Sequence, residues 1–238
     1  MIRIRPDGSG SSGVGKASGR RGTGILILLT ALCVAIEAVL VLSDLGLIAH
    51  GRLRQLAYAY GGFWPGLLQG WQPNFAGQPW AMFLTHGFLH GGIAHLGFNM
   101  VTLWSLGRPL LDAGGRARFL AIWAVAQFLG GCAYAGLWSE PRPMVGASGA
   151  LFGLAGAWLA AIWNDPADAG ESRHLVLWIV ALLAGLNLAM VWALDGQLAW
   201  QTHLGGFAGG WIVAVLTGLA PPGDQGSERA GSGQGSDS

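Results

Sequence analysis

The stretch that decides the fold is THGFLHGGIAHLGFNMVTLWSL, residues 85–106. From Leu89 to Leu106 it is apolar enough to cross a bilayer as a helix, yet it contains His95 and Asn99. Residues four positions apart share one face of a helix, so these two polar side chains lie together. Polar side chains in hydrocarbon are unfavourable, and their presence in an apolar span indicates a functional site by default.

The composition of the 238-residue chain favours a membrane protein. Apolar residues make up 52% and charged residues 11% of the chain, and the mean hydropathy is +0.47. A soluble domain carries roughly 25% charged residues. The net charge of +1 and the lack of a basic stripe argue against a nucleic-acid partner. No Cys/His cluster has the spacing of a zinc site, so we expect neither a metal nor another cofactor.

Six apolar segments are candidate membrane spans, and together they predict an all-α bundle over residues 23–220. They are Ile25–Leu45, Leu89–Leu106, Phe119–Trp138, Ser148–Trp163, Leu175–Ala193 and Thr202–Leu219. The segment 46–88 is rich in Trp and Phe but broken by Pro and Gly, which favours a position in the membrane interface. The Gly- and Ser-rich ends, 1–22 and 221–238, are expected to be disordered tails.

The basic residues predict the orientation of the bundle. Ten of the 13 Lys and Arg fall on the side of the chain termini, and only Arg52, Arg54 and Arg142 fall on the other. The positive-inside rule therefore places both termini in the cytoplasm. Spans two, four and six then all enter from the outer face, so their first turns can meet in the outer half of the membrane.

The fourth span opens with GASGALFG, residues 146–153. Ser148 stands at the start of the helix, where free backbone N–H groups favour negative charge. Gly146 and Gly149 remove side chains that would block a substrate backbone. In a chain with 41 Gly, however, a serine between glycines is by itself more often a helix-packing residue.

The sixth span opens with His203, whose imidazole could take a proton from a serine hydroxyl and return it to a leaving group. No carboxylate lies beside it, so a Ser148–His203 dyad is favoured over a triad. The alternative is that His203 only hydrogen-bonds another helix. Phe152 could lie flat against the imidazole or be ordinary packing. Gly206 is one of several small residues at four-residue spacing that favour close packing of spans four and six.

The second span supplies hydrogen-bond donors. Asn99 is the better oxyanion donor because an amide needs no protonation, and His95 could donate as well. His86 and His90 precede the regular helix, and we expect them to fix the loop rather than take part in catalysis. Glu37 lies in the middle of the first span; it is protonated, paired with a polar group such as that of Asn187, or part of an ion path.

Taken together, residues 85–100, 146–153 and 203–210 resemble the rhomboid intramembrane serine proteases, and the resemblance extends over most of residues 25–220. It implies that Ser148 is the nucleophile and His203 its base.

The resemblance also implies an oxyanion hole lined by His95, Asn99 and the Ser148 backbone N–H, with Gly146 adjoining it. His90, Phe152 and Gly206 are expected to support these groups. The implied partners are the lipid bilayer and transmembrane protein substrates, which would enter at a lateral gate formed by span five and the loop after it.

The chain departs from the family pattern at two positions. Trp80 is followed by Ala81 where the family usually has arginine, and Leu111 stands where the family commonly has glutamate. Both positions look structural, so the departures concern loop rigidity more than chemistry.

The sequence therefore predicts an intramembrane serine endopeptidase, with a bacterial cytoplasmic membrane suggested by the compact form. Two other functions stay open: a non-catalytic binder or quality-control factor with the same fold, and a small transporter that couples protons through Glu37 and the histidines.

Overall fold

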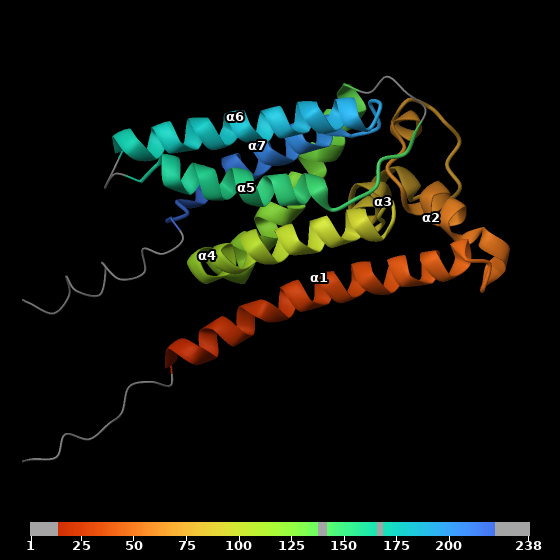
Figure 1. Cartoon of the computed structure of the whole chain (residues 1–238), viewed down its shortest axis with the longest axis horizontal. Coiled ribbons are helices and arrows are strands. Elements are labelled where there is room, and N and C mark those ends of the chain that lie inside the picture. Colours follow the sequence, from red (N-terminus) through yellow and green to blue (C-terminus); the bar gives the residue numbers. More distant parts are fainter. Residues whose placement is uncertain (1–13, 138–141, 166–168, 222–238) are drawn as a thin grey trace, which may run out of the picture.

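The computed structural model describes residues 14–137, 142–165 and 169–221, and these residues are almost entirely helical (Figure 1). The helices are α1 (Val14–Asp44), η1 (Ala49–Gly51), α2 (Leu53–Gly61), η2 (Pro65–Leu68), α3 (Gln78–Thr85), η3 (His86–Phe88), α4 (Ile93–Gly136), α5 (Ser148–Trp163), α6 (Ala169–Ala193) and α7 (Trp200–Thr217). The first helix begins at Val14, inside the segment 1–22 that was expected to be a disordered tail. The rest of that tail, 1–13, and residues 222–238 lie outside the described residues.

Three helices of the described chain are long and apolar enough to cross a membrane. Their apolar portions are Thr23–Asp44, Ile93–Gly136 and Gly170–Ala193. Helix α5 is apolar but has only 16 residues, a length of about 24 Å at 1.5 Å per residue. That is shorter than a hydrocarbon core of about 30 Å.

Helix α4 contains two of the predicted spans in one element of 44 residues. Its continuity is broken at Gly115, where φ is 72° and ψ is −178°. Only glycine adopts such a conformation without strain. The chain folds back at this residue, so the two arms of α4 run in different directions (Figure 1). The expected boundary between spans two and three therefore lies at a single glycine.

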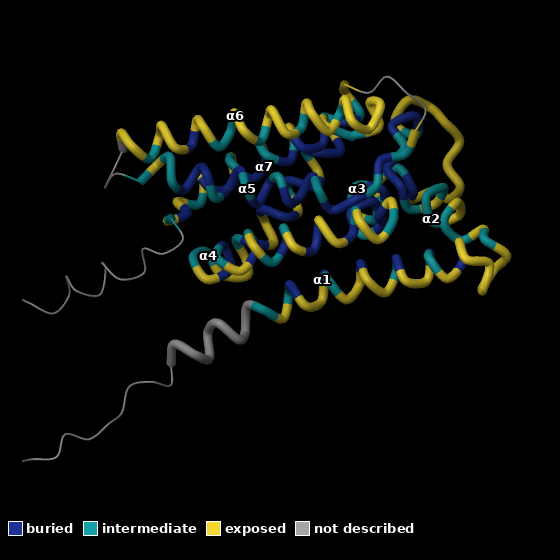
Figure 2. Tube along the Cα trace, in the orientation of Figure 1, coloured by how far each residue is buried: buried dark blue, intermediate teal, exposed yellow. Residues whose placement is uncertain are grey.

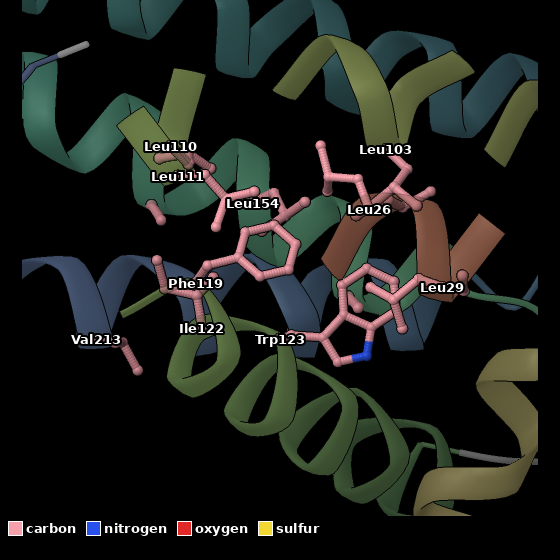
Figure 3. Packing of buried hydrophobic residues seen from close by; sticks show 14 of the residues in the cluster. Leu26, Leu29, Leu103, Leu110, Leu111, Phe119, Ile122, Trp123, Leu154 and Val213 are labelled. Atoms are coloured by element: carbon pink, nitrogen blue, oxygen red, sulfur yellow. The ribbon is translucent and has the colours of Figure 1, made fainter. Parts of the chain in front are cut away.

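The main hydrophobic core lies where α1, α4, α5 and α7 meet (Figure 3). Leu26 of α1, Leu103 and Phe119 of the two arms of α4, and Leu154 of α5 are fully buried there. Burial follows the same arrangement, because α5 is largely buried and α7 is buried on one side, whereas α6 is exposed along most of its length (Figure 2). The exposed side chains of α6 are largely apolar, as expected for a helix that faces lipid.

Helices α5 and α7 pack backbone against backbone. A Cβ built at Gly206 would lie 2.0 Å from the carbonyl oxygen of Gly149, and one at Gly210 would lie 1.8 Å from that of Gly153. No side chain fits in either place. The predicted close packing of these two spans through small residues is confirmed, and it brings the first turns of α5 and α7 together.

The segment between α1 and α4 forms backbone hydrogen bonds with the loop that precedes α5. Phe63 and Met144 exchange two backbone hydrogen bonds, each of 2.9 Å. Two residues further on, the Gly146 N–H donates to the carbonyl oxygen of His86 over 3.0 Å. Phe63 is fully buried and packs edge-to-face on His86 and Tyr134. These contacts fix the position of the loop, and therefore of Ser148, the first residue of α5.

Glu37 is paired with Arg54, which no local pattern in the sequence indicated as its partner. The guanidinium contacts both carboxylate oxygens, at 2.8 and 3.2 Å, and Glu37 is 1% exposed. Arg54 also donates to the carbonyl oxygen of His90 over 2.9 Å, and Tyr58 donates to the same oxygen over 2.8 Å. The suggested pairing of Glu37 with Asn187 is wrong, because Arg54 occupies the carboxylate. The cluster ties α1 and α2 to the loop before α4.

Candidate active site

Ser148 and His203 lie at the first turns of two adjoining helices, and their side chains meet. The Ser148 Oγ is 2.9 Å from Nε2 of His203, although the two residues are 55 positions apart in sequence. His203 is 7% exposed, and Ser148 is half-buried at the start of α5. The distance is that of a hydrogen bond from a hydroxyl to a ring nitrogen. This is the spacing that a serine nucleophile and its general base require.

The imidazole of His203 is fixed from two other directions. The ring of Phe152 lies parallel to it, with the ring centroids 4.2 Å apart and an angle of 8° between the planes. The sequence had left open whether Phe152 would stack in this way. The other ring nitrogen of His203, Nδ1, lies 2.5 Å from Oδ1 of Asn187 in α6. Phe152 sets the plane of the ring, and Asn187 contacts it within that plane.

His95 and Asn99 lie beside Gly146, two residues before Ser148. Gly146 has φ of 126°, and a Cβ there would come within 2.9 Å of His95 Nε2 and 3.7 Å of Asn99 Nδ2. Only a glycine at position 146 therefore leaves open the space beside the side chains of His95 and Asn99. The predicted convergence of the second span with the loop before α5 is present.

Both side chains present a donor to this space. Asn99 is buried, and its Nδ2 has no hydrogen-bond acceptor among the described residues. Nδ1 of His95 accepts a hydrogen bond from the Gly91 N–H over 3.2 Å, so the neutral ring carries its proton on Nε2. A buried polar group without a partner calls for an explanation. A developing oxyanion would supply the missing acceptor.

His86 and His90 support the loops around this site. His86 is buried; its Nδ1 is 2.6 Å from the Met82 carbonyl oxygen, and its own carbonyl holds Gly146. Burial lowers the pKa of His86 to about 4, so the ring is neutral at pH 7. His90 packs edge-to-face on His95, with centroids 5.3 Å apart. His86 thus has the kind of structural hydrogen bond that the sequence predicted, whereas both ring nitrogens of His90 are buried without a hydrogen-bond partner among the described residues.

An apolar cavity of about 450 Å³ opens beside His203, between α6 and α7. Phe152, Leu183 and Phe207 are among its lining residues, and His203 and Asn187 contribute polar atoms to it. The imidazole thus contacts an apolar space that is bounded by the most exposed helix of the described chain.

Sequence reasoning missed Asn187 as a partner of His203 and Gln127 as part of the site's surroundings. Both Gln127 side-chain atoms are buried without a partner among the described residues, and a Cβ at Gly87 would meet its Nε2. The available signal was the same in both cases: an amide in an otherwise apolar span.

Comparison with known proteins places these residues in a family. The family model described as the Rhomboid domain matches residues 76–220, which include Asn99, Ser148 and His203. The chain is 34% identical over 145 residues to "Rhomboid protease GluP" of Bacillus subtilis (strain 168) and 30% identical over 139 residues to "RHOMBOID-like protein 4" of Arabidopsis thaliana. It is 26% identical over 152 residues to "Rhomboid-type serine protease 2" of Emericella nidulans.

These matches cover 60%, 58% and 61% of the chain, but only 27%, 34% and 28% of the three relatives. The chain thus spans about a third of the length of the proteins named above, or somewhat less. The apolar helices and the matched domain together identify a multi-pass integral membrane protein. Because the family model covers more than half of the sequence, the chain belongs to the rhomboid family.

Proposed function

We propose that this chain is an intramembrane serine endopeptidase that cleaves transmembrane segments of other membrane proteins. The observation that carries the proposal is the 2.9 Å approach of Ser148 Oγ to His203 Nε2, on helices held together at Gly149 and Gly206. Relatives named as rhomboid proteases support the same reaction class.

In the proposed reaction, the Ser148 oxygen attacks a peptide carbonyl while its proton passes to Nε2 of His203. The tetrahedral oxyanion accepts hydrogen bonds from Asn99 Nδ2, His95 Nε2–H and the Ser148 backbone N–H. His203 then gives the proton to the leaving amine, and the acyl group remains on Ser148. Water attacks this ester with the same base, which returns Ser148 to its starting state.

The substrate helix has to unwind locally, because a helix engages its own carbonyl groups in hydrogen bonds. Helix α6 is the proposed side of entry, since most of its side chains are exposed and it borders the cavity at His203. The loop that follows α6 would take part in the same gate. Water would reach Ser148 from the outer face.

The proposed topology has six crossings and both termini in the cytoplasm. It is supported by the fold-back of α4 at Gly115, which separates two arms, and by the excess of Lys and Arg on one side. A bacterial cytoplasmic membrane is the proposed location, with residues 46–88 in its outer interface. Residues 23–220 would form the membrane domain, and 1–22 and 221–238 its cytoplasmic tails.

Fluorophosphonate labelling in detergent, followed by peptide mapping, tests the proposal. We expect wild-type protein to be modified at Ser148 and to cleave a transmembrane substrate, and Ser148→Ala to do neither. Ser105→Ala is a matched control, because Ser105 is exposed and its hydroxyl bonds the Val101 carbonyl of its own helix.

Wild-type protein that is folded yet neither labelled nor active would favour a non-catalytic binder of membrane helices. Proton flux abolished by Glu37→Gln, with Ser148→Ala harmless, would favour a transporter.

A further inference from the structure

His203 has a second polar partner besides Ser148, in addition to the stacked ring of Phe152. Oδ1 of Asn187 lies 2.5 Å from Nδ1 of the imidazole. The orientation of the amide is fixed by its other end, because Nδ2 donates to the Leu183 carbonyl oxygen over 3.0 Å. Oδ1 is therefore an acceptor facing the ring, and the Nδ1–H of His203 donates to it.

This bond determines which form of the neutral ring is present. A neutral imidazole carries one proton, on either Nδ1 or Nε2. With the proton on Nδ1, the lone pair of Nε2 faces the Ser148 hydroxyl and can take its proton. With the proton on Nε2, the ring has no acceptor for Ser148 and cannot act as its base.

The surroundings make Asn187 hard to replace in this role. The cavity at His203 is lined almost wholly by apolar side chains, including Val180, Leu188 and Phe207. In such surroundings a buried N–H without an acceptor is strongly unfavourable. No carboxylate contacts the ring among the hydrogen bonds and ion pairs of the described residues.

We propose that Asn187 is the positioning residue of His203, and that it makes activation of Ser148 depend on helix α6. The amide holds the ring in the tautomer that accepts the serine proton on Nε2, and it keeps its hydrogen bond to the Nδ1–H of the imidazolium that forms. Ser148 and His203 lie on helices locked together by glycine contacts, whereas Asn187 lies on the exposed helix. A displacement of α6 away from α7 therefore breaks the hydrogen bond without separating Ser148 from His203. The inference rests on the proposed peptidase function.

The test compares Asn187→Leu, Asn187→Asp and wild type in the rate of fluorophosphonate labelling and in kcat and KM for a transmembrane substrate. Leucine has a similar volume and no acceptor, so we expect labelling and kcat to fall about 10- to 100-fold, by analogy with the loss of partners that orient metal-bound histidines. KM should stay within about 2-fold, since no ground-state contact is lost. Aspartate retains an acceptor oxygen and should restore labelling to within about 5-fold of wild type.

Leu186→Ala is the matched control, because Leu186 is the exposed neighbour of Asn187 on α6 and is absent from the cavity lining. It should leave labelling unchanged. Equal labelling of wild type and Asn187→Leu would overturn the inference while leaving the proposed function intact. Absence of labelling in folded wild-type protein would instead remove the proposed function.

A measurement on the wild-type protein covers the case in which the leucine variant does not fold. Histidine ring nitrogens labelled with ¹⁵N distinguish the two neutral tautomers, and a His203→Gln sample assigns the signals of this ring. We expect His203 to carry its proton on Nδ1 at pH 8. A proton on Nε2 would overturn the inference.

Discussion

The α-carbon of Gly210 lies so close to the backbone of Gly153 that a Cβ at position 210 would stand 1.8 Å from the Gly153 carbonyl oxygen. The obstacle is backbone, so it cannot move aside as a flexible side chain would. Helices α5 and α7 meet in the same way at Gly149 and Gly206, one turn nearer the site. The approach of Ser148 to His203 depends on this spacing.

Gly210→Ala should therefore destabilise the protein by about 1–3 kcal/mol, the range typical of overpacking. It should also slow fluorophosphonate labelling, because any separation of α5 from α7 lengthens the Ser148–His203 hydrogen bond. Gly97→Ala is the control, since a Cβ at Gly97 meets no atom within 4 Å. Thermal unfolding in detergent measures both variants, and equal midpoints would contradict the packing argument.

Asn99→Ala should reduce kcat by about 10²–10³-fold, as expected when one oxyanion donor is removed. Stability should not fall, because Nδ2 of Asn99 is buried without a partner among the described residues. Thr102→Ala serves as the comparison: Thr102 is half-buried on the same helix, and its hydroxyl donates to the Phe98 carbonyl oxygen. Single-turnover cleavage together with unfolding separates the two effects, and a parallel loss of stability and activity would argue against an oxyanion role.

Arg54→Met should destabilise the fold by about 3–5 kcal/mol, because it leaves the Glu37 carboxylate buried and unpaired. Glu37→Gln combined with Arg54→Met should recover part of that loss. Asp44→Asn also removes a partner of Arg54. Because Asp44 is more exposed than Glu37, this change should lower the free energy of unfolding by less than about 1 kcal/mol. Denaturant titrations of wild type, the two single variants and the double variant measure their free energies of unfolding. The lowest value in Asp44→Asn would contradict the expected order.

Acidification should weaken the fold through His86. Burial lowers the pKa of His86 to about 4, below its usual value of 6.5, so the folded state binds this proton less readily than the unfolded state does. The stabilisation of the folded state by neutral His86 is therefore fully present above pH 6.5, and it is lost as the pH falls from 6.5 towards 4. His86→Asn, which keeps a donor for the Met82 carbonyl, should show a smaller drop in unfolding midpoint between pH 7.5 and pH 5. An identical drop in both proteins would assign the pH dependence to other groups.

The sequence predicted the parts of this fold that repeat along a helix. Apolar length located the helices, and the four-residue spacing of Gly149 and Gly153 predicted the close approach of α5 to α7. The positions of Ser148 and His203 at the starts of two such spans predicted that their side chains can meet, and the two lie within hydrogen-bonding distance. In each case a local pattern reports directly on a helix face or a helix start.

The two polar pairs that were missed join elements whose relative rotation no local pattern specifies. Glu37 and Arg54 are 17 positions apart, across the turn that follows α1. Asn187 and His203 are 16 positions apart on separate helices. A Glu or Asn in an apolar helix indicates that the side chain needs a polar partner. To identify that partner, one must know the rotation of each helix about its own axis.

The unequal lengths of α5 and α6 have a consequence for how lipid composition would act on this protein. Helix α6 has 25 residues and α5 has 16, so hydrophobic mismatch would act on them differently. A thinner bilayer would increase the tilt of α6, while the glycine-locked pair α5 and α7 would keep its geometry. Because Asn187 is carried by the tilting helix, acyl-chain length would then tune the proposed activity without any change in the position of Ser148.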